Sequence, residues 1–474
     1  MKHIKYIYIL LLFIGVTSMI SGCKEYFDLN ENPNFVQAPP LNSLLSTVTH
    51  KTGIFSRNMA NIVNNYSQYI ASPVESSALD TYEITDQTSQ WDSVYRAMSD
   101  IYDMQVLARS VNSTEHLGVA NVLMAYNLGL ITDIFGAAPY SQAFGGSVLN
   151  PVYDGEEALY NECLNLLNEA IDLLNQDNSA VVLGVNQDLI HGGNRLAWLK
   201  TANAIKARFL NKVSKKSIYD PNAVLSALDN AYTSNADDAG MGVFQGNNPW
   251  AQVAISNANA LLGGWLSDNF VNHLNGTTYG VFDPRIEQIT DRTIHGVFKG
   301  TRNGQGNLGP AANTVRDESY ISVNSPWTSE ESPLWIVTYA ETKFIEAEAA
   351  FRTNDIPRAY QAYLDGIAAN MNKLQVPQAA AQEYINNPVV SVGANALTLN
   401  LIFKEKYVTT YLNAEAWNDV RRHDYQYENF RMPMNAQLDT FIRRMAYPVG
   451  EISKNGTNVP AEVPLSTNLW WDRP

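Results

Sequence analysis

Residues 339 to 373 of the chain read YAETKFIEAEAAFRTNDIPRAYQAYLDGIAANMNK. Two segments of this stretch, Tyr339 to Phe351 and Pro357 to Lys373, carry apolar residues at the spacing of amphipathic helices. The residues Arg352-Thr353-Asn354-Asp355 between them are typical of a turn. A helix pair of this length resembles one tetratricopeptide-like unit. The stretch therefore predicts that helical hairpins build the scaffold of the fold.

Most of the chain after Leu41 shows the same helical pattern. In Glu157 to Leu174, apolar residues recur every three or four positions, and Asp154 precedes them as a plausible cap. No strict repeat period joins these segments. We therefore predict a mostly α fold with one large helical domain over residues 41–474, in which hairpins form a scaffold and not a regular solenoid. The other predicted segments are His116 to Ile131, Arg195 to Val213, Asn222 to Tyr232 and Leu399 to Val420.

Residues from about 240 to 333 differ from the rest of the domain. Gly, Asn, Ser and Pro are frequent there, and no apolar period lasts beyond a turn or two. Loops of this length are usually functional. We therefore expect this loop-rich region to contribute to a ligand-binding site.

The first 22 residues are typical of a signal peptide. Lys2 and Lys5 precede the apolar run of residues 7–14, and small residues follow. A membrane-spanning helix needs about 20 apolar residues in succession, and this run is shorter. We therefore predict that residues 1–22 direct export and are removed.

Ser21-Gly22-Cys23 resembles a bacterial lipobox. The resemblance implies cleavage before Cys23 and acylation of this residue, with the acyl chains holding the protein at a membrane. Residues 23–40 are polar and end in Pro39-Pro40, so we interpret them as a lipidated tether. An ordinary signal peptide followed by a chance cysteine is the alternative.

The charge of the chain argues against a nucleic-acid-binding protein, and its cysteine count argues against a fold stabilised by disulfides. Removing Lys2 and Lys5 with the signal peptide, which contains no acid, changes the formal net charge from −15 to −17. Such an acidic chain is a poor partner for nucleic acid. The cysteines are Cys23 and Cys163, so with Cys23 lipidated no disulfide can form and a large core must stabilise the fold. The 25 tyrosines and 9 tryptophans exceed what packing alone needs, and we expect some rings to face a ligand.

Motifs of catalysis and of cofactor binding are absent from the sequence. There is no His-Glu-x-x-His, Gly-x-Ser-x-Gly, P-loop or Cys-x-x-Cys, and the histidines lack the spacing of metal ligands. Residues 304–309 match Gly-x-Gly-x-x-Gly, but Pro310 follows and neither a strand before nor a helix after is evident. We therefore expect no catalytic residue, cofactor or metal. Acid pairs such as Glu330-Glu331 leave a glycoside hydrolase as a remote alternative.

Several motifs in order resemble the SusD/RagB family of outer-membrane lipoproteins. The helix Tyr339-Ala340-Glu341 to Glu346-Ala347-Glu348-Ala349 matches its Tyr-Ala-Glu…Ala-Glu-Ala pattern. The other matching segments are Asn30-Glu31-Asn32-Pro33-Asn34, Asp283-Pro284-Arg285, Lys404-Glu405-Lys406-Tyr407, Glu415-Ala416-Trp417-Asn418-Asp419-Val420-Arg421-Arg422, Arg443-Arg444-Met445-Ala446-Tyr447-Pro448, and Glu451 with Asn455. The charged residues of these motifs are suited to ion pairs and to capping carbonyl groups, so we interpret them as structural.

The resemblance implies a function as well as a fold. Such a protein sits at the cell exterior, anchored by lipid in the outer membrane, and covers a TonB-dependent, SusC-like transporter. It binds oligosaccharides or polysaccharide, or in some members peptides, and delivers them without catalysis. A peptide binder on the same scaffold is therefore the main alternative. Flat aromatic rings and amide side chains in the sequence suit sugar binding.

The candidate ligand-binding residues lie in two polar regions that contain isolated rings. The first region runs from Asp80 to Trp91, and the second extends from Asn247 to Trp327. For each ring, burial in the core is the alternative, and Trp417 in the family motif is expected to be core. The candidates are Tyr82, Trp91, Asn248, Trp250, Trp265, Tyr279, Tyr320 and Trp327.

Overall fold

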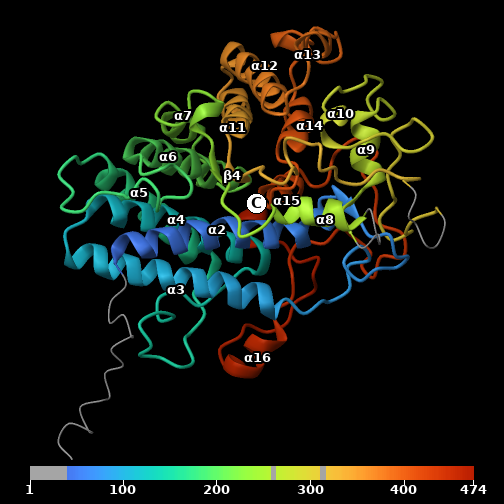
Figure 1. Cartoon of the computed structure of the whole chain (residues 1–474). Coiled ribbons are helices and arrows are strands. Elements are labelled where there is room, and N and C mark those ends of the chain that lie inside the picture. Colours follow the sequence, from blue (N-terminus) through green and yellow to red (C-terminus); the bar gives the residue numbers. More distant parts are fainter. Residues whose placement is uncertain (1–39, 258–262, 310–315) are drawn as a thin grey trace, which may run out of the picture. The chain divides into compact units, whose positions relative to one another are not determined.

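The fold is mostly α-helical, as predicted. A computed structural model describes residues 40–257, 263–309 and 316–474 (Figure 1). The signal peptide, Cys23 and the tether up to residue 39 lie outside the described residues. Helices account for most of the regular structure, and the described strands form two small two-stranded sheets.

The N-terminal half of the domain is a stack of long helices. Helix α4 is buried along its whole length between its neighbours α3 and α5, and Ser113 caps its start by accepting a hydrogen bond from His116 N. Its length and hydropathy would suit a membrane span, but its burial identifies it as the core helix of the stack. The bounds are α2 Leu41–Tyr66, α3 Thr88–Ser110, α4 Thr114–Phe135, α5 Glu156–Leu174, α6 Arg195–Lys212 and α7 Pro221–Leu228.

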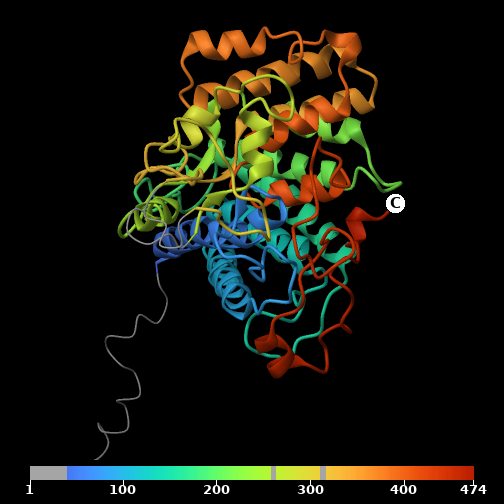
Figure 2. The same cartoon turned by 90° about the vertical axis from the view of Figure 1, so that its right-hand side faces the viewer.

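The predicted hairpin of residues 339–373 is present as two packed helices. Thr338 caps the first helix through Glu341 N, Asp355 caps the second through Arg358 N, and Asn354 turns the chain with a φ of 63°. Figure 2 shows these orange helices above the blue and cyan ones. The bounds are α11 Tyr339–Arg352, α12 Ile356–Lys373, α13 Gln378–Ile385, α14 Leu399–Thr409 and α15 Glu415–Arg422.

One predicted helix is interrupted. The sequence predicts a single segment from Leu399 to Val420, but the chain leaves the helix after Thr409 and resumes it at Glu415. Leu412 in the gap has a φ of 59°, and the Tyr411 carbonyl accepts a hydrogen bond from Trp327 Nε1 at 3.0 Å. A contact with a distant segment therefore replaces the helical hydrogen bonds that the local sequence favours.

Short elements tie the loop-rich region to the helices. Strand β1 pairs with β3 and β2 with β4, both antiparallel, so residues 239–241 and 265–266 are each anchored to distant parts of the chain. The bounds are β1 Ile70–Ala71, β2 Ala239–Met241, β3 Trp265–Leu266, β4 Leu334–Val337, α8 Pro249–Asn257, α9 Asp268–Leu274, α10 Ile286–Ile289, α16 Val449–Asn455, and the 3-10 helices η1 Asn235–Asp237, η2 Ala394–Ala396 and η3 Trp470–Asp472.

The glycines of residues 304–309 serve close packing between loops. Gly304 and Gly306 both have positive φ, and a Cβ on Gly304 would collide with the Met434 carbonyl oxygen. Beside them the buried Asp80 carboxylate accepts hydrogen bonds from Asn303 Nδ2 at 2.8 Å and from Gly304 N at 3.2 Å. The Gly-x-Gly-x-x-Gly segment therefore joins the loops that contain Asp80 and Met434, so that three loops meet here.

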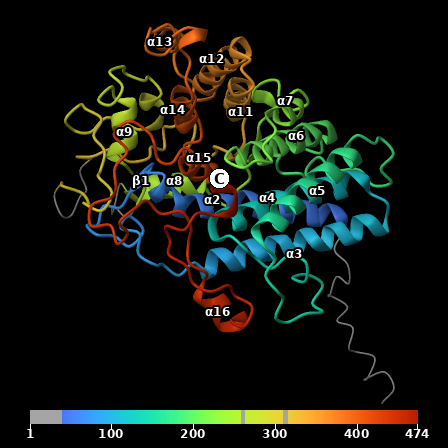
Figure 3. The same ribbon diagram turned by 180° about the vertical axis from the view of Figure 1, so that it is seen from behind.

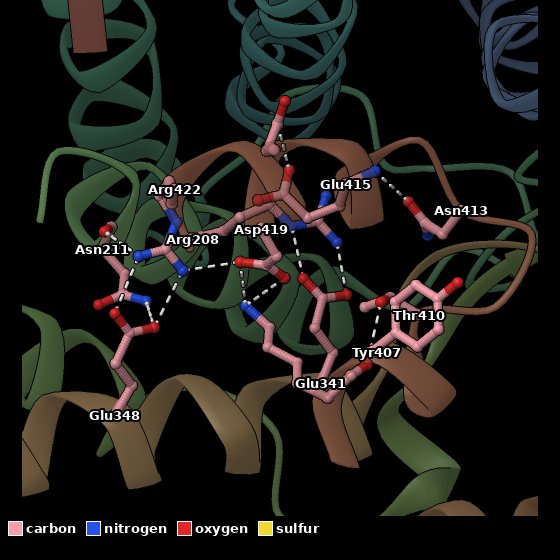
Figure 4. A network of polar contacts seen from close by, with 12 residues as sticks. Arg208, Asn211, Glu341, Glu348, Tyr407, Thr410, Asn413, Glu415, Asp419 and Arg422 are labelled. Carbon is pink, nitrogen blue, oxygen red and sulfur yellow. Dashed lines mark hydrogen bonds and ion pairs between the residues drawn. The ribbon is translucent and has the colours of Figure 1, made fainter. Parts of the chain in front are cut away.

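A buried network of charged side chains holds the helices together (Figure 4). Arg422 on α15 pairs with Glu348 on α11 at 2.8 Å and with Asp419 at 2.6 Å. Arg208 on α6 pairs with Glu341 on α11 at 2.7 Å. All of these side chains are almost fully buried. The charged residues of the family motifs thus act as structural cross-links between helices.

Arg421 caps carbonyl groups instead of pairing with a carboxylate. Its guanidinium donates hydrogen bonds to the Asp133 and Arg443 carbonyl oxygens, both at 2.7 Å. Because these partners lie on different segments, Arg421 joins the end of α15 to α4 and to the C-terminal part of the chain.

Candidate ligand-binding site

Six of the eight candidate residues are buried, namely Tyr82, Trp91, Asn248, Trp250, Trp265 and Trp327. Trp91 packs against Phe135 with ring centroids 5.1 Å apart. Asn248 donates from Nδ2 to the Ser332 carbonyl oxygen and accepts from Trp250 N, so it fixes the start of α8. For these residues, burial in the core was the alternative to ligand binding in the sequence analysis, and the structure shows this burial.

Tyr320 is half-buried, but one face of its ring is already occupied. The Arg316 guanidinium lies 3.9 Å from the ring centroid, and Trp265 packs 5.8 Å away. A cation over the face of a tyrosine is itself a favourable contact. One face of the Tyr320 ring is therefore unavailable to a ligand.

Tyr279 lies at a cavity of about 310 Å³. The cavity is built from three segments that are distant in sequence: the loop after α9, the start of α14 and the chain that follows α15. We call it the Tyr279 cavity. Its other lining residues are Asn400, Leu401, Lys404, Gln426, Tyr427, Glu428 and Asn429.

Lys404 supplies a buried cation to the wall of this cavity. Its Nζ lies 3.1 Å from a Glu405 carboxylate oxygen and 4.7 Å from the centroid of the Tyr279 ring. Glu405 also pairs with Arg285. Although burial raises the pKa of Glu405, Lys404 and Arg285 hold it at about 2. The wall therefore stays charged and fixed in place at neutral pH.

Two further rings matter at this cavity: His273 packs behind Tyr279, and Tyr427 lines the wall. His273 packs edge-on against Tyr279 with centroids 4.6 Å apart, and burial lowers the pKa of His273 to about 3, so this histidine is neutral. Tyr427 is buried, and its Oη has no hydrogen-bond partner among the described residues. That hydroxyl is shielded from solvent, so it is a buried polar group of the fold and not a contact for a ligand.

The rim of the Tyr279 cavity is polar and exposed. Asn400, Gln426, Glu428 and Asn429 all lie at the surface around the half-buried Tyr279 ring. Amide groups donate to and accept from hydroxyl groups, carboxylates accept from them, and a tyrosine ring covers an apolar sugar face. Among the described residues, no group of three or more metal-ligating side chains could hold an ion. The arrangement suits binding of a small polyhydroxylated unit.

The sequence matches a family model described as "Starch-binding associating with outer membrane" over residues 33–448. The chain belongs to this SusD-like family. A SusD/RagB family protein from Bacteroides thetaiotaomicron has the same fold, with a TM-score of 0.77 at 20% identity over 92% of this chain and 99% of that one. A chitin-binding SusD homolog from Flavobacterium johnsoniae has a TM-score of 0.73 at 20% identity, over 90% and 98% of the two chains. No curated protein matches.

Sequence reasoning identified one wall of the SusD-like chain's cavity and missed the other two. Tyr279 follows the polar loop Asn275-Gly276-Thr277-Thr278, which marked it as a candidate. In the sequence, Lys404 belongs to a family motif, and Tyr427 matches none of the candidate patterns. The run Gln426-Tyr427-Glu428-Asn429, a ring among polar residues, is the signal that could have revealed the third wall.

Proposed function

We propose that the protein is a cell-surface lipoprotein of the outer membrane that binds oligosaccharides or polysaccharide and delivers them to a TonB-dependent, SusC-like transporter. The family description supports starch-like ligands and the outer membrane. The single structural observation that carries the proposal is the Tyr279 cavity, where a half-buried ring faces amide and carboxylate side chains. Binding without catalysis suffices for this role.

The cavity supports modest affinity. Stacking of one sugar face on Tyr279 contributes about 1 kcal/mol, and each net hydrogen bond from the rim amides adds about 1 kcal/mol. A millimolar dissociation constant corresponds to about 4 kcal/mol, which a few such contacts supply. Capture of this strength permits transfer of the ligand to a transporter.

Affinity gels that contain starch or soluble chitin provide the test. The protein used would start at Lys24, and the variant Tyr279→Ala would be compared with Tyr102→Ala, a half-buried tyrosine of α3 outside the cavity. Removing the Tyr279 ring removes the stacking platform, so we expect roughly tenfold weaker retention for that variant alone.

Equal retention of the two variants would exclude the Tyr279 cavity as the glycan site. Failure of the unaltered protein to bind any polysaccharide, together with binding of peptides, would favour the peptide-binding alternative. Shortening of the polysaccharide during the experiment would instead indicate a glycoside hydrolase.

A further inference from the structure

Two adjoining pockets form a groove beside α16. Their volumes are about 760 Å³ and 380 Å³, and both are lined by Ile84, Glu462 and Val463. We call the combined feature the Ile84 groove. Figure 3 shows α16 below α3, and the two helices are in contact. None of the residues that line the Tyr279 cavity line this groove, so it is a separate site.

The groove is lined mainly by aliphatic side chains that remain exposed. Ile84 and Val449 are each 62% exposed and Ile452 is 51% exposed. Tyr447 is half-buried, and its hydroxyl donates to the Ala137 carbonyl oxygen. The exposed part of the lining is aliphatic and does not offer the flat rings that sugar faces prefer, and contiguous exposed apolar surface marks sites of interaction with proteins.

The apolar surface continues from α16 onto a neighbouring loop. Asn455 Nδ2 donates to the Pro151 carbonyl oxygen at 2.8 Å, and Asn458 Nδ2 donates to that of Asn150 at 3.0 Å. These bonds hold the 148–152 loop against α16. Leu149 in this loop is 94% exposed, and Val148 and Val152 are exposed as well. A partner could therefore bury apolar area on both sides of the helix.

One wall of the groove offers backbone hydrogen bonds. Residues 461–464 are neither helix nor turn, and the N–H groups of Ala461, Glu462 and Val463 have no partner among the described residues. Leu465, directly after this segment, is held in place because its carbonyl oxygen accepts hydrogen bonds from Arg443 N and Arg444 N. A fixed segment with free backbone groups can pair with an added strand.

The exposed charges of the groove are negative. Glu83 and Glu462 lie at its surface, whereas the lining cation Arg444 is buried and donates to the Phe135 carbonyl oxygen. A ligand with positive charge would complement these exposed carboxylates.

We propose that the Ile84 groove binds an extended peptide segment of a partner protein, in which apolar side chains alternate with lysine or arginine. The apolar side chains would cover Ile84, Val449 and Val463, and the basic ones would face Glu83 and Glu462. The backbone of the segment would pair with residues 461–463. This inference does not depend on glycan binding at the Tyr279 cavity.

The direct test uses an octapeptide of alternating valine and lysine, labelled for fluorescence anisotropy, with a valine and glutamate octapeptide for comparison. We expect the basic peptide to bind with a dissociation constant below about 1 mM and the acidic one not to bind at that concentration. Glu462→Lys should weaken binding at least tenfold, and Ile84→Ser should do the same. Glu75→Lys and Val74→Ser, which change exposed residues outside the groove, should have no effect.

No binding of the basic peptide, equal binding of the acidic one, or equal losses in the control variants would overturn the proposal. The proposal would also be overturned if the protein formed a dimer and Ile84→Ser abolished that dimer. In that case a second copy of the chain would cover the groove. A photo-crosslinking residue at Val463 in whole cells identifies the source of the segment. Crosslinks to a basic, apolar segment of an outer-membrane protein support a partner, and crosslinks to free peptides alone contradict it.

Discussion

Glu415 is a buried carboxyl group at the start of α15, within the charged network of Figure 4. Its carboxylate accepts a hydrogen bond from Asn418 Nδ2 at 2.8 Å. Burial raises the pKa of Glu415 to about 7, opposed by the nearby cations Arg208 and Lys212 and reinforced by Asp419 and Asp133. This group therefore titrates close to neutral pH.

The raised pKa predicts that Glu415 destabilises the fold as pH rises. Between the usual carboxyl pKa and about 7, the folded protein holds a proton that the unfolded chain has released, so stability falls across this window. Glu415→Gln is neutral at every pH and avoids the loss. We compare the free energy of unfolding of Glu415→Gln with that of the unaltered protein. We expect the difference in favour of the variant to grow by about 1–3 kcal/mol between pH 5 and pH 8.

Denaturant unfolding at both pH values measures this difference. Glu331→Gln, which changes an exposed carboxyl group, is the control and should shift stability equally at pH 5 and pH 8. An advantage of Glu415→Gln that does not change with pH would contradict the raised pKa.

At the scale of elements, the charged network joins α11 and α15 through buried ion pairs. Arg422 is almost fully buried and pairs with Glu348 and Asp419. Without it, Glu348 would keep its pair with Arg352 and Asp419 its pair with Lys406, but each carboxylate would lose a buried guanidinium partner. Removing one member of such a network typically costs 3–5 kcal/mol. We therefore expect Arg422→Ala to lower the free energy of unfolding by about this amount, as measured in denaturant.

Arg109→Ala is the matched control for Arg422→Ala. Arg109 on α3 pairs with Glu169 on α5 at 3.5 Å, but both side chains are about half exposed. Exposed pairs contribute about 0–1 kcal/mol, so this variant should remain close to the unaltered protein. Similar losses in the two variants would show that burial of the network does not set its contribution.

The local pattern predicted elements well because helical periodicity is a local property. The segment Glu157 to Leu174 corresponds to α5 at Glu156–Leu174, and the hairpin of residues 339–373 is present with its turn. The break between α14 and α15 was missed because no glycine or proline marks it, and the bond from Trp327 Nε1 to the Tyr411 carbonyl spans 84 residues. Tertiary contacts of this kind override local preference.

The candidate site was harder to predict for the same reason. Trp250, Trp265 and Trp327 stand among polar residues in the sequence, yet each is buried by segments that are distant along the chain. Trp250, for example, packs under the Arg57 guanidinium at 4.2 Å. The Tyr279 cavity needs three such segments at once, so a single sequence revealed only the loop that carries Tyr279.

At the scale of the whole molecule, the proposed function requires attachment to the membrane through Cys23. Among the described residues, α4 is the one helix long and apolar enough to span a membrane, and it is buried in the core. Each buried methylene of an acyl chain contributes about 0.8 kcal/mol, so several chains on Cys23 would anchor the protein firmly. The domain would then stay attached through the tether alone.

Cys23→Ser should therefore move the protein from the membrane fraction to the soluble fraction and abolish labelling with palmitate. Cys163→Ser is a natural control, because Cys163 is buried in α5 with its Sγ 3.5 Å from the Ala125 carbonyl oxygen. That variant loses some stability but should keep its lipid and its place in the membrane fraction. Retention of Cys23→Ser in membranes after a carbonate wash would show that another segment or a tightly held partner anchors the chain.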